Sequence, residues 1–247
     1  MADYKSIVAY DGTEFEGFQR QANGHRTVQG EFEAALRNLD WTERSLRAAG
    51  RTDRGVHARG QVVAFGLEWT HGPLRLTQAL NSDLPPDVAV RSTQRVPDGF
   101  HPRYAALSRC YRYLLYSEAT RDPLRERRAW RVWPAPDLAR MRRAAVDIVG
   151  QRDFRPFGTD PGSSGNTIRR VIMAEWSDSE DGLAFRIEAD AFLFRMVRRI
   201  VSAMVAVGQG KTSIEAFETL LEDPGERWQL GLAPARGLCL ESVNFEA

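Results

Sequence analysis

One stretch of the chain combines a single carboxylate with several arginines and could therefore carry chemistry. Residues 49–61 read AGRTDRGVHARGQ and contain only one acidic residue, Asp53, which is also the only acid between Glu43 and Glu68. The surrounding arginines favour the ionised carboxylate, so Asp53 would act as a base or nucleophile rather than as an acid. The alternative interpretation is a turn residue whose side chain bonds the neighbouring backbone.

A second charged residue, Arg198, stands in an apolar helical pattern. The stretch at residues 191–208 reads AFLFRMVRRIVSAMVAVG, which places Phe194 and Val201 on the same helix face as Arg198. Burying a guanidinium is costly unless a carboxylate meets it, so Asp53 is a candidate partner. Alternatively, the arginine extends along its aliphatic stem to solvent.

Other catalytic patterns are incomplete. The segment GQGKT at residues 208–212 resembles part of a P-loop, but Val205 stands where the first glycine is required. The four histidines lack the spacing of metal ligands, and Cys110 and Cys239 lack a zinc pattern. His57 lies near Asp53, but no serine or cysteine has a nucleophile motif around it, and a glycosidase would need a second carboxylate. We expect neither a metal nor a cofactor.

Composition narrows the class of protein. A hydrophobic content of 43% in 247 residues is typical of a soluble globular protein, and we expect a cytoplasmic protein without a membrane-spanning segment. The formal net charge is only +1, but residues 95–155 contain 14 Arg against 7 acidic residues, a net charge of +7. This segment could form a phosphate-binding face, although a solvated surface would show the same composition.

Hydrophobic periodicity predicts a repeated order of strands and helices. In the first half we expect strands at 6–10, 45–49, 62–65 and 88–91, and helices at 28–39, behind a Thr27 cap, and 74–80. In the second half we expect strands at 110–116, 168–176, 183–189 and 238–245. The expected helices are 138–149, behind an Asp137 cap, 192–207, and 213–222 with a capping box from Thr212 to Glu215.

The order β-α-β-β-α-β occurs twice, which predicts an α+β fold of two ferredoxin-like halves. We expect the halves at residues 1–98 and 99–247, in one catalytic unit that shares a composite, mainly antiparallel sheet with helices on one face and a catalytic cleft between the halves. Residues 49–61 would then form a long loop on this scaffold, where functional sites are common.

Several motifs resemble those of the tRNA pseudouridine synthase A family. They are YDGTEFEGFQRQ, TVQGEFEAAL, GRTDRGVHARGQV, FHPRYAALSRCYRY, FLFRMVRRIV and GLCL, in this order from Tyr10 to Leu240. One departure is Phe18, where family members usually carry tryptophan, but a bulky ring is retained.

The resemblance implies an isomerase that converts uridine to pseudouridine at positions 38, 39 and 40 of the tRNA anticodon stem-loop, without cofactor or metal. It implies that Asp53 is the catalytic carboxylate and that Tyr111, Arg51 and Arg198 bind the substrate. Tyr111 would stack on the target base, Arg51 would hold or displace RNA, and Arg198 would pair with Asp53. It also implies a homodimer.

Two alternatives remain open. One is a related RNA pseudouridine synthase with a different uridine target, and the other is a non-catalytic tRNA-binding protein on the same scaffold. The second is disfavoured because a binder needs no buried acid.

Overall fold

The computed structural model describes residues 1–22, 24–160, 162, 165–225 and 227–246. The chain forms two compact units. The first unit contains Met1–Leu107 together with the C-terminal segment that begins at Cys239, and the second unit contains Ser108–Leu238. The fold is α+β, as predicted from the sequence.

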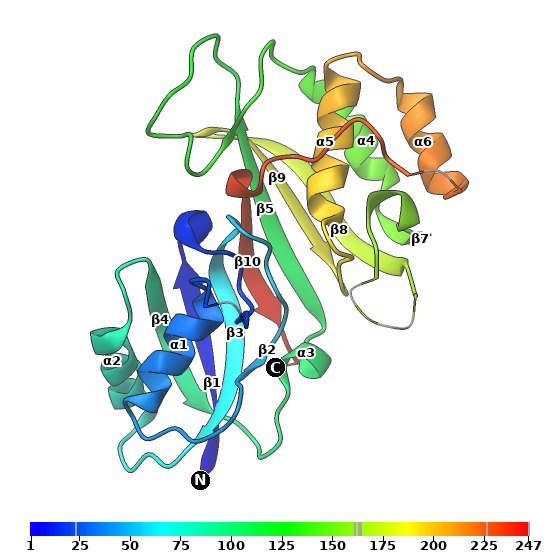
Figure 1. Cartoon of the computed structure of the whole chain (residues 1–247). Helices are drawn as coiled ribbons and strands as arrows, with labels where there is room; N and C mark the ends of the chain where they lie inside the picture. Colours follow the sequence, from blue (N-terminus) through cyan, green and yellow to red (C-terminus); the bar gives the residue numbers. More distant parts are fainter. Residues whose placement is uncertain (23, 161, 163–164, 226, 247) are drawn as a thin grey trace. The chain divides into compact units, whose positions relative to one another are not determined.

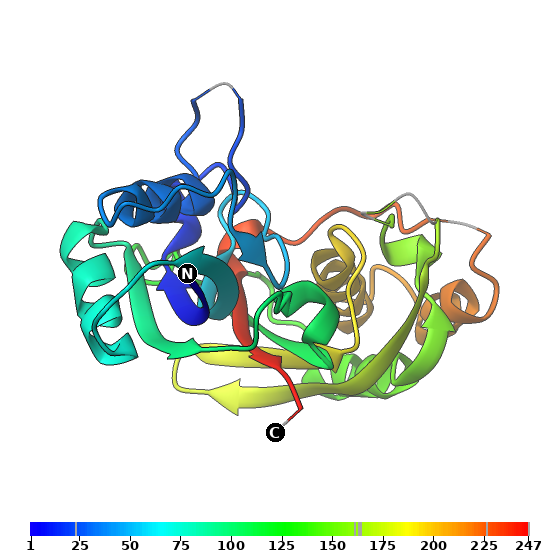
Figure 2. The same cartoon turned by 90° about the horizontal axis from the view of Figure 1, so that it is seen from below.

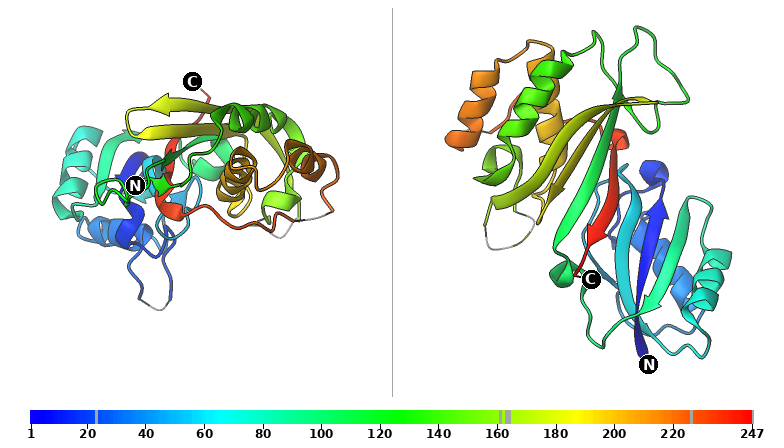
Figure 3. Two further views of the ribbon diagram at one scale, coloured as in Figure 1. Left: turned by 90° about the horizontal axis from the view of Figure 1, so that it is seen from above. Right: turned by 180° about the vertical axis from the view of Figure 1, so that it is seen from behind.

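The first unit is built on a twisted sheet with the long strands β1 and β3 at its centre (Figure 3). Its elements are β1 (Ala2–Tyr10), α1 (Val28–Arg37), β2 (Arg47–Ala48), β3 (His57–Leu67), α2 (Pro73–Asp83), β4 (Val88–Arg95), α3 (Pro102–Ala105) and β10 (Leu238–Asn244). β1 pairs antiparallel with both β3 and β4. Because β1 occupies one edge of β3, the antiparallel β2 and the parallel β10 share the other edge.

Two helices cover the sheet of the first unit. α1 and α2 lie next to each other in Figures 1 and 2. α1 begins at the predicted cap, where Thr27 Oγ1 accepts a hydrogen bond from Gly30 N at 3.2 Å. Phe32 of α1 lies with its ring centroid 5.9 Å from that of Phe65 on β3, and both side chains are buried. The apolar face of α1 therefore packs on the sheet that contains β2 and β3, the two strands joined by the loop at residues 49–56.

The second unit repeats this arrangement of sheet and helices. Its elements are β5 (Ser108–Tyr116), β6 (Trp130–Arg131), α4 (Leu138–Asp147), β7 (Gly150–Asp153), β8 (Ile168–Ser179), β9 (Gly182–Ala189), α5 (Met196–Gly208) and α6 (Ile214–Glu222). The sheet order is β5-β9-β8-β7, and all three pairs are antiparallel. α4 and α5 pack on each other over this sheet, with α6 beside them (Figure 1).

Three helix termini test the predictions from the sequence. Asp137 caps α4 as predicted, accepting from Ala139 N at 2.8 Å. The cap of α6 is Ser213, which accepts from Ala216 N at 3.1 Å, so the predicted cap at Thr212 is wrong. α5 begins at Met196 rather than at Phe192, because Arg195 adopts the left-handed conformation with φ 62°.

The strands differ from the prediction at two places that matter for the site. β3 begins at His57, so the segment HARGQ is strand, although it is polar and glycine-rich. β10 belongs to the first unit through its parallel pairing with β3 at Cys239↔His57 and Leu240↔Ala58. This division differs from the expected halves 1–98 and 99–247, because the last strand adds to the sheet formed by the beginning of the chain.

Among the described residues, no helix is both long enough and apolar enough to cross a membrane.

Candidate active site

Asp53 lies in a short loop between β2 and β3. The loop turns at Asp53 itself, where Val56 N donates to Asp53 O at 3.1 Å and Gly55 takes a positive φ of 75°. Only glycine adopts this conformation without a steric penalty. Asp53 is half-buried, whereas Arg51 and Arg54 are exposed. The structure therefore shows a turn at Asp53, whereas the catalytic role of its carboxylate stays a prediction.

The residue before Asp53 is fixed by two hydrogen bonds from other parts of the first unit. Thr52 is buried, and its Oγ1 lies 2.8 Å from the hydroxyl of Tyr10 on β1. Its carbonyl oxygen accepts from Phe18 N at 3.1 Å. Further upstream, Gln61 Nε2 donates to Gly50 O at 3.1 Å. These contacts hold the backbone of the loop in one arrangement.

The segment at Gly17 and Phe18 packs directly against the loop. Gly17 has a φ of 102°, and a Cβ atom at this position would lie 3.2 Å from Thr52 O and 3.3 Å from Arg54 N. The ring of Phe18 is buried with its centroid 6.3 Å from that of Tyr10. Only a residue without a side chain allows the backbone to approach the loop this closely.

His57 lies at the base of the Asp53 loop. It is buried on β3, and its Nδ1 accepts a hydrogen bond from Gly12 N at 3.0 Å. This bond ties the end of β1 to the start of β3 and thereby supports the base of the Asp53 loop.

The second unit places Tyr111 and Tyr113 on the same face of β5, as alternation predicts. Tyr113 is completely buried, and its hydroxyl donates to Pro234 O at 2.8 Å. Burial raises the pKa of Tyr113 far above its usual value, against the opposing effect of the nearby Arg198 and Arg236. Tyr111 is only half-buried and meets Phe192 edge-on, with ring centroids 5.1 Å apart. The two tyrosines point to the same side of the strand, so alternation could not distinguish them. Their different burial does distinguish them.

Arg198 lies in the first turn of α5 and is half-buried. Its Nε donates to Ala233 O at 2.8 Å, and Ala233 N donates back to Arg198 O at 3.3 Å. Phe194 precedes the helix and is not the helical neighbour that the sequence argument assumed. The arginine is nevertheless partly desolvated, because it packs against the segment around Ala233 that Tyr113 also contacts.

The four predicted site residues therefore form two groups. Asp53 and Arg51 belong to one loop of the first unit, and Tyr111 and Arg198 belong to the second unit. The pairing of Asp53 with Arg198 would join the two groups, and it stays a prediction. In the part of the chain that the structure describes, no cluster of three His, Cys, Asp or Glu residues could hold a metal ion.

The prediction missed the residues that hold the loop in place, namely Tyr10, Gly17 and Thr52. Tyr10 and Gly17 fall within the motif YDGTEFEGFQRQ, which was noted only for its resemblance. A glycine between two bulky aromatic residues, Phe15 and Phe18, is the signal that could have indicated a close approach of two backbones.

Comparison with known proteins identifies the family. The family model described as tRNA pseudouridine synthase matches residues 7–105 and 144–246. A protein of Geobacter sulfurreducens named tRNA pseudouridine synthase A is 42% identical over 99% of this chain and 100% of its own length. Proteins of the same name from Geobacillus kaustophilus (39% identity, 98% of this chain and 94% of that protein) and Roseiflexus castenholzii (38%, 96% and 88%) match similarly.

The chain therefore belongs to the tRNA pseudouridine synthase family. It is an enzyme, an isomerase of the class that converts uridine to pseudouridine, and the resemblance noted in the sequence is confirmed.

Proposed function

We propose that the protein isomerises uridines 38, 39 and 40 of the tRNA anticodon stem-loop, with Asp53 as the essential carboxylate. The observation that carries this proposal is the fixed loop around Asp53. The turn at Val56 N and the two bonds of Thr52 fix the backbone at Asp53, and the neighbouring Arg51 and Arg54 are exposed. A polyanionic substrate would meet these arginines first.

The reaction requires few catalytic groups. Pseudouridine forms when the C1′–N1 glycosidic bond breaks, the uracil turns, and C5 bonds to C1′; C5 then loses a proton and N1 gains one. The isomerisation is redox-neutral, and no water has to be activated because the uracil does not leave. One carboxylate suffices, whether it attacks C1′, adds to the base or removes a proton from the ribose.

Tyr111 and Arg198 are proposed as the contribution of the second unit. A target base has to leave the helical stack and needs a surface to stack on. Tyr111 is suited to this because it is half-buried and held edge-on by Phe192, whereas Tyr113 is completely buried. The guanidinium of Arg198 is held at Nε by Ala233 O, and we propose that it pairs with Asp53.

Modification mapping of bulk tRNA after incubation with the purified protein tests the proposal. Pseudouridine at positions 38, 39 and 40 would support it. Pseudouridine at other uridines would indicate the alternative, a related synthase with a different target. Tight tRNA binding without any pseudouridine would indicate a non-catalytic binder and contradict the proposal.

Two further expectations accompany this function. We propose a homodimer that acts in the cytoplasm, as the resemblance implies. Sedimentation equilibrium gives the oligomeric state directly, and a monomer at micromolar concentration would contradict the dimer.

A further inference from the structure

A buried carboxylate that the proposed chemistry does not use lies on α1. Glu33 has 0% of its side chain exposed, although it is charged and sits in a helix whose neighbouring residues Phe32 and Leu36 form the core. Removing a carboxylate from water is costly unless hydrogen bonds and opposite charges compensate. The partners of Glu33 therefore indicate which side chains it positions.

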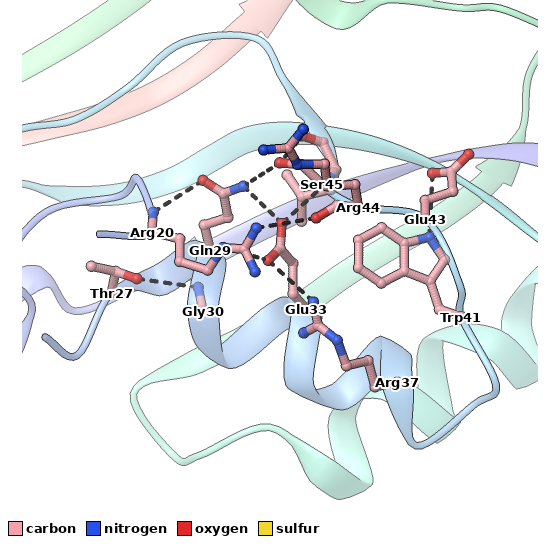
Figure 4. Close-up of polar contacts among 11 residues, drawn as sticks. Arg20, Thr27, Gln29, Gly30, Glu33, Arg37, Trp41, Glu43, Arg44 and Ser45 are labelled. Carbon is pink, nitrogen blue, oxygen red and sulfur yellow. Dashed lines mark hydrogen bonds and ion pairs between the residues drawn. The ribbon is translucent and has the colours of Figure 1, made fainter. Parts of the chain in front are cut away.

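Each carboxylate oxygen of Glu33 has a different set of partners (Figure 4). Oε1 accepts from Gln29 Nε2 at 2.8 Å and from Leu46 N at 3.2 Å. Oε2 lies 3.2 Å from Arg20 Nε and 3.8 Å from Arg37 Nη2. Among the described residues no group has hydrogen-bond geometry to Oε2, so its compensation is the charge of the two arginines.

Arg20 is held at three points, while 43% of its side chain remains exposed. Its backbone N donates to Gln29 Oε1 at 3.1 Å, its Nε faces Glu33, and its Nη2 donates to Arg44 O at 3.1 Å. An arginine has five N–H donors, so others remain available for a ligand. The guanidinium is thereby fixed in direction before any ligand arrives, which reduces the entropy lost on binding.

This arginine is connected to the Asp53 loop through a short path. Gln29 N donates to Phe18 O at 2.9 Å, and Phe18 N donates to Thr52 O at 3.1 Å. Arg20 follows Phe18 by two residues. Arg20 and the Asp53 loop are therefore anchored to the same segment of the first unit.

The local charge favours an anion. Within the described part of the chain, Glu33 is the carboxylate that pairs with Arg20, and it also pairs with Arg37. A third arginine, the exposed Arg44, accepts a hydrogen bond from Arg20 through its carbonyl oxygen. The planar fork of a guanidinium matches a phosphate group. We propose that Arg20 binds a backbone phosphate of the tRNA beside the target uridine, with Glu33 as the positioning residue. The identity of the RNA rests on the proposed function.

Binding of an unmodified tRNA transcript, measured against salt concentration, tests the site in three variants. Arg20→Ala loses a charged hydrogen bond, so affinity at low salt should fall about tenfold or more. The slope of log affinity against log salt should become shallower by about one, as expected for one lost phosphate contact. In steady-state kinetics the larger share of the loss should appear in KM.

Arg37→Ala is the matched control. Arg37 pairs with the same Glu33 oxygen and has 47% of its side chain exposed, but it forms no bond to Arg44 O. Its replacement should change affinity less than about twofold, as for a surface ion pair. Glu33→Gln keeps the shape of the side chain but no longer fixes the direction of the Arg20 guanidinium, so the affinity for tRNA should fall. Because Arg20 and its phosphate contact are retained, the slope of log affinity against log salt should stay that of the wild type.

Two results would overturn the site. One is unchanged affinity and slope in Arg20→Ala, and the other is an unchanged slope with the loss confined to kcat, which would make Arg20 a support of the Asp53 loop. If Glu33→Gln does not fold, the Arg20 and Arg37 variants still decide the question. Failure of the proposed function has a different signature, namely wild-type protein that binds tRNA with a steep salt dependence and forms no pseudouridine.

Discussion

Replacing Gly17 with alanine tests whether the contact of this residue with the Asp53 loop matters for catalysis. Gly17 has a φ of 102°, which strains any other residue by about 1–3 kcal/mol. The new Cβ would also lie 3.2 Å from Thr52 O, 3.3 Å from Arg54 N and 3.5 Å from Asp53 C. The two shorter contacts are tighter than van der Waals packing and involve backbone atoms, so the loop has to move by a few tenths of an ångström.

Both effects can be measured. Strain and contact together predict a loss of about 2–3 kcal/mol of unfolding free energy, or about 5–10 °C in Tm for a chain of this size. Since a misplacement of 1 Å costs about a hundredfold in rate, the smaller shift should lower kcat about tenfold with little change in tRNA affinity. Pseudouridine formation under saturating tRNA and thermal unfolding of the same preparation are the assays.

Gly150→Ala separates strain from contact. Gly150 has a nearly identical φ of 107°, but a Cβ there would have no atom within 4 Å. This variant should lose only the stability that strain costs, about 1–3 kcal/mol, and keep its kcat. If Gly17→Ala has the same kcat as Gly150→Ala, the contact does not position Asp53, and the reasoning is refuted.

The remaining predictions concern Tyr111, salt and alkaline pH. Tyr111→Phe should be severely slowed with tRNA binding unchanged if the hydroxyl helps to remove the C5 proton, and this is the outcome we expect; Tyr111→Ala should lose activity in either case, and wild-type activity of the Ala variant would contradict the assignment. Binding of tRNA should weaken steeply with salt, because arginine-rich segments displace counterions from phosphates; a flat plot of log affinity against log salt would be inconsistent with this. Burial raises the pKa of Tyr113 above its unfolded value of 10.0, so its contribution to stability is present below that pH and is lost as pH rises further. The Tm of Tyr113→Phe should accordingly fall less steeply above about pH 10 than that of the wild type, and parallel curves would contradict the shift.

Local patterns were sufficient for most of the fold. Alternation and helical periodicity predicted the long strands and the helices of both units, and the caps at Thr27 and Asp137 were found because Thr and Asp favour that position. The start of β3 was missed since His57–Gln61 is polar and glycine-rich, and the strand forms there through pairing with β1 and β10. Pairing between segments so distant in sequence overrides local preference.

Only part of the candidate site could be predicted from the sequence. Asp53 was singled out as a candidate by its isolation among arginines, but the sequence argument did not use its supports, the hydroxyl of Tyr10 and the close backbone approach at Gly17. Glu33 follows Phe32 in α1 and was not singled out, although it is fully buried. The spacing of Gln29 and Glu33, four residues apart on one helix face, was the available signal.

Asp53→Asn in a single-turnover reaction with excess enzyme tests the central claim most directly. The amide keeps the shape and removes the charge, so we predict no pseudouridine above background and a tRNA affinity within about tenfold of the wild type. Glu16→Gln is the matched control, because it removes a carboxylate that lies 3.2 Å from Arg54 of the same loop, and it should keep most of the rate. Pseudouridine formation by Asp53→Asn at a near wild-type rate would contradict the account.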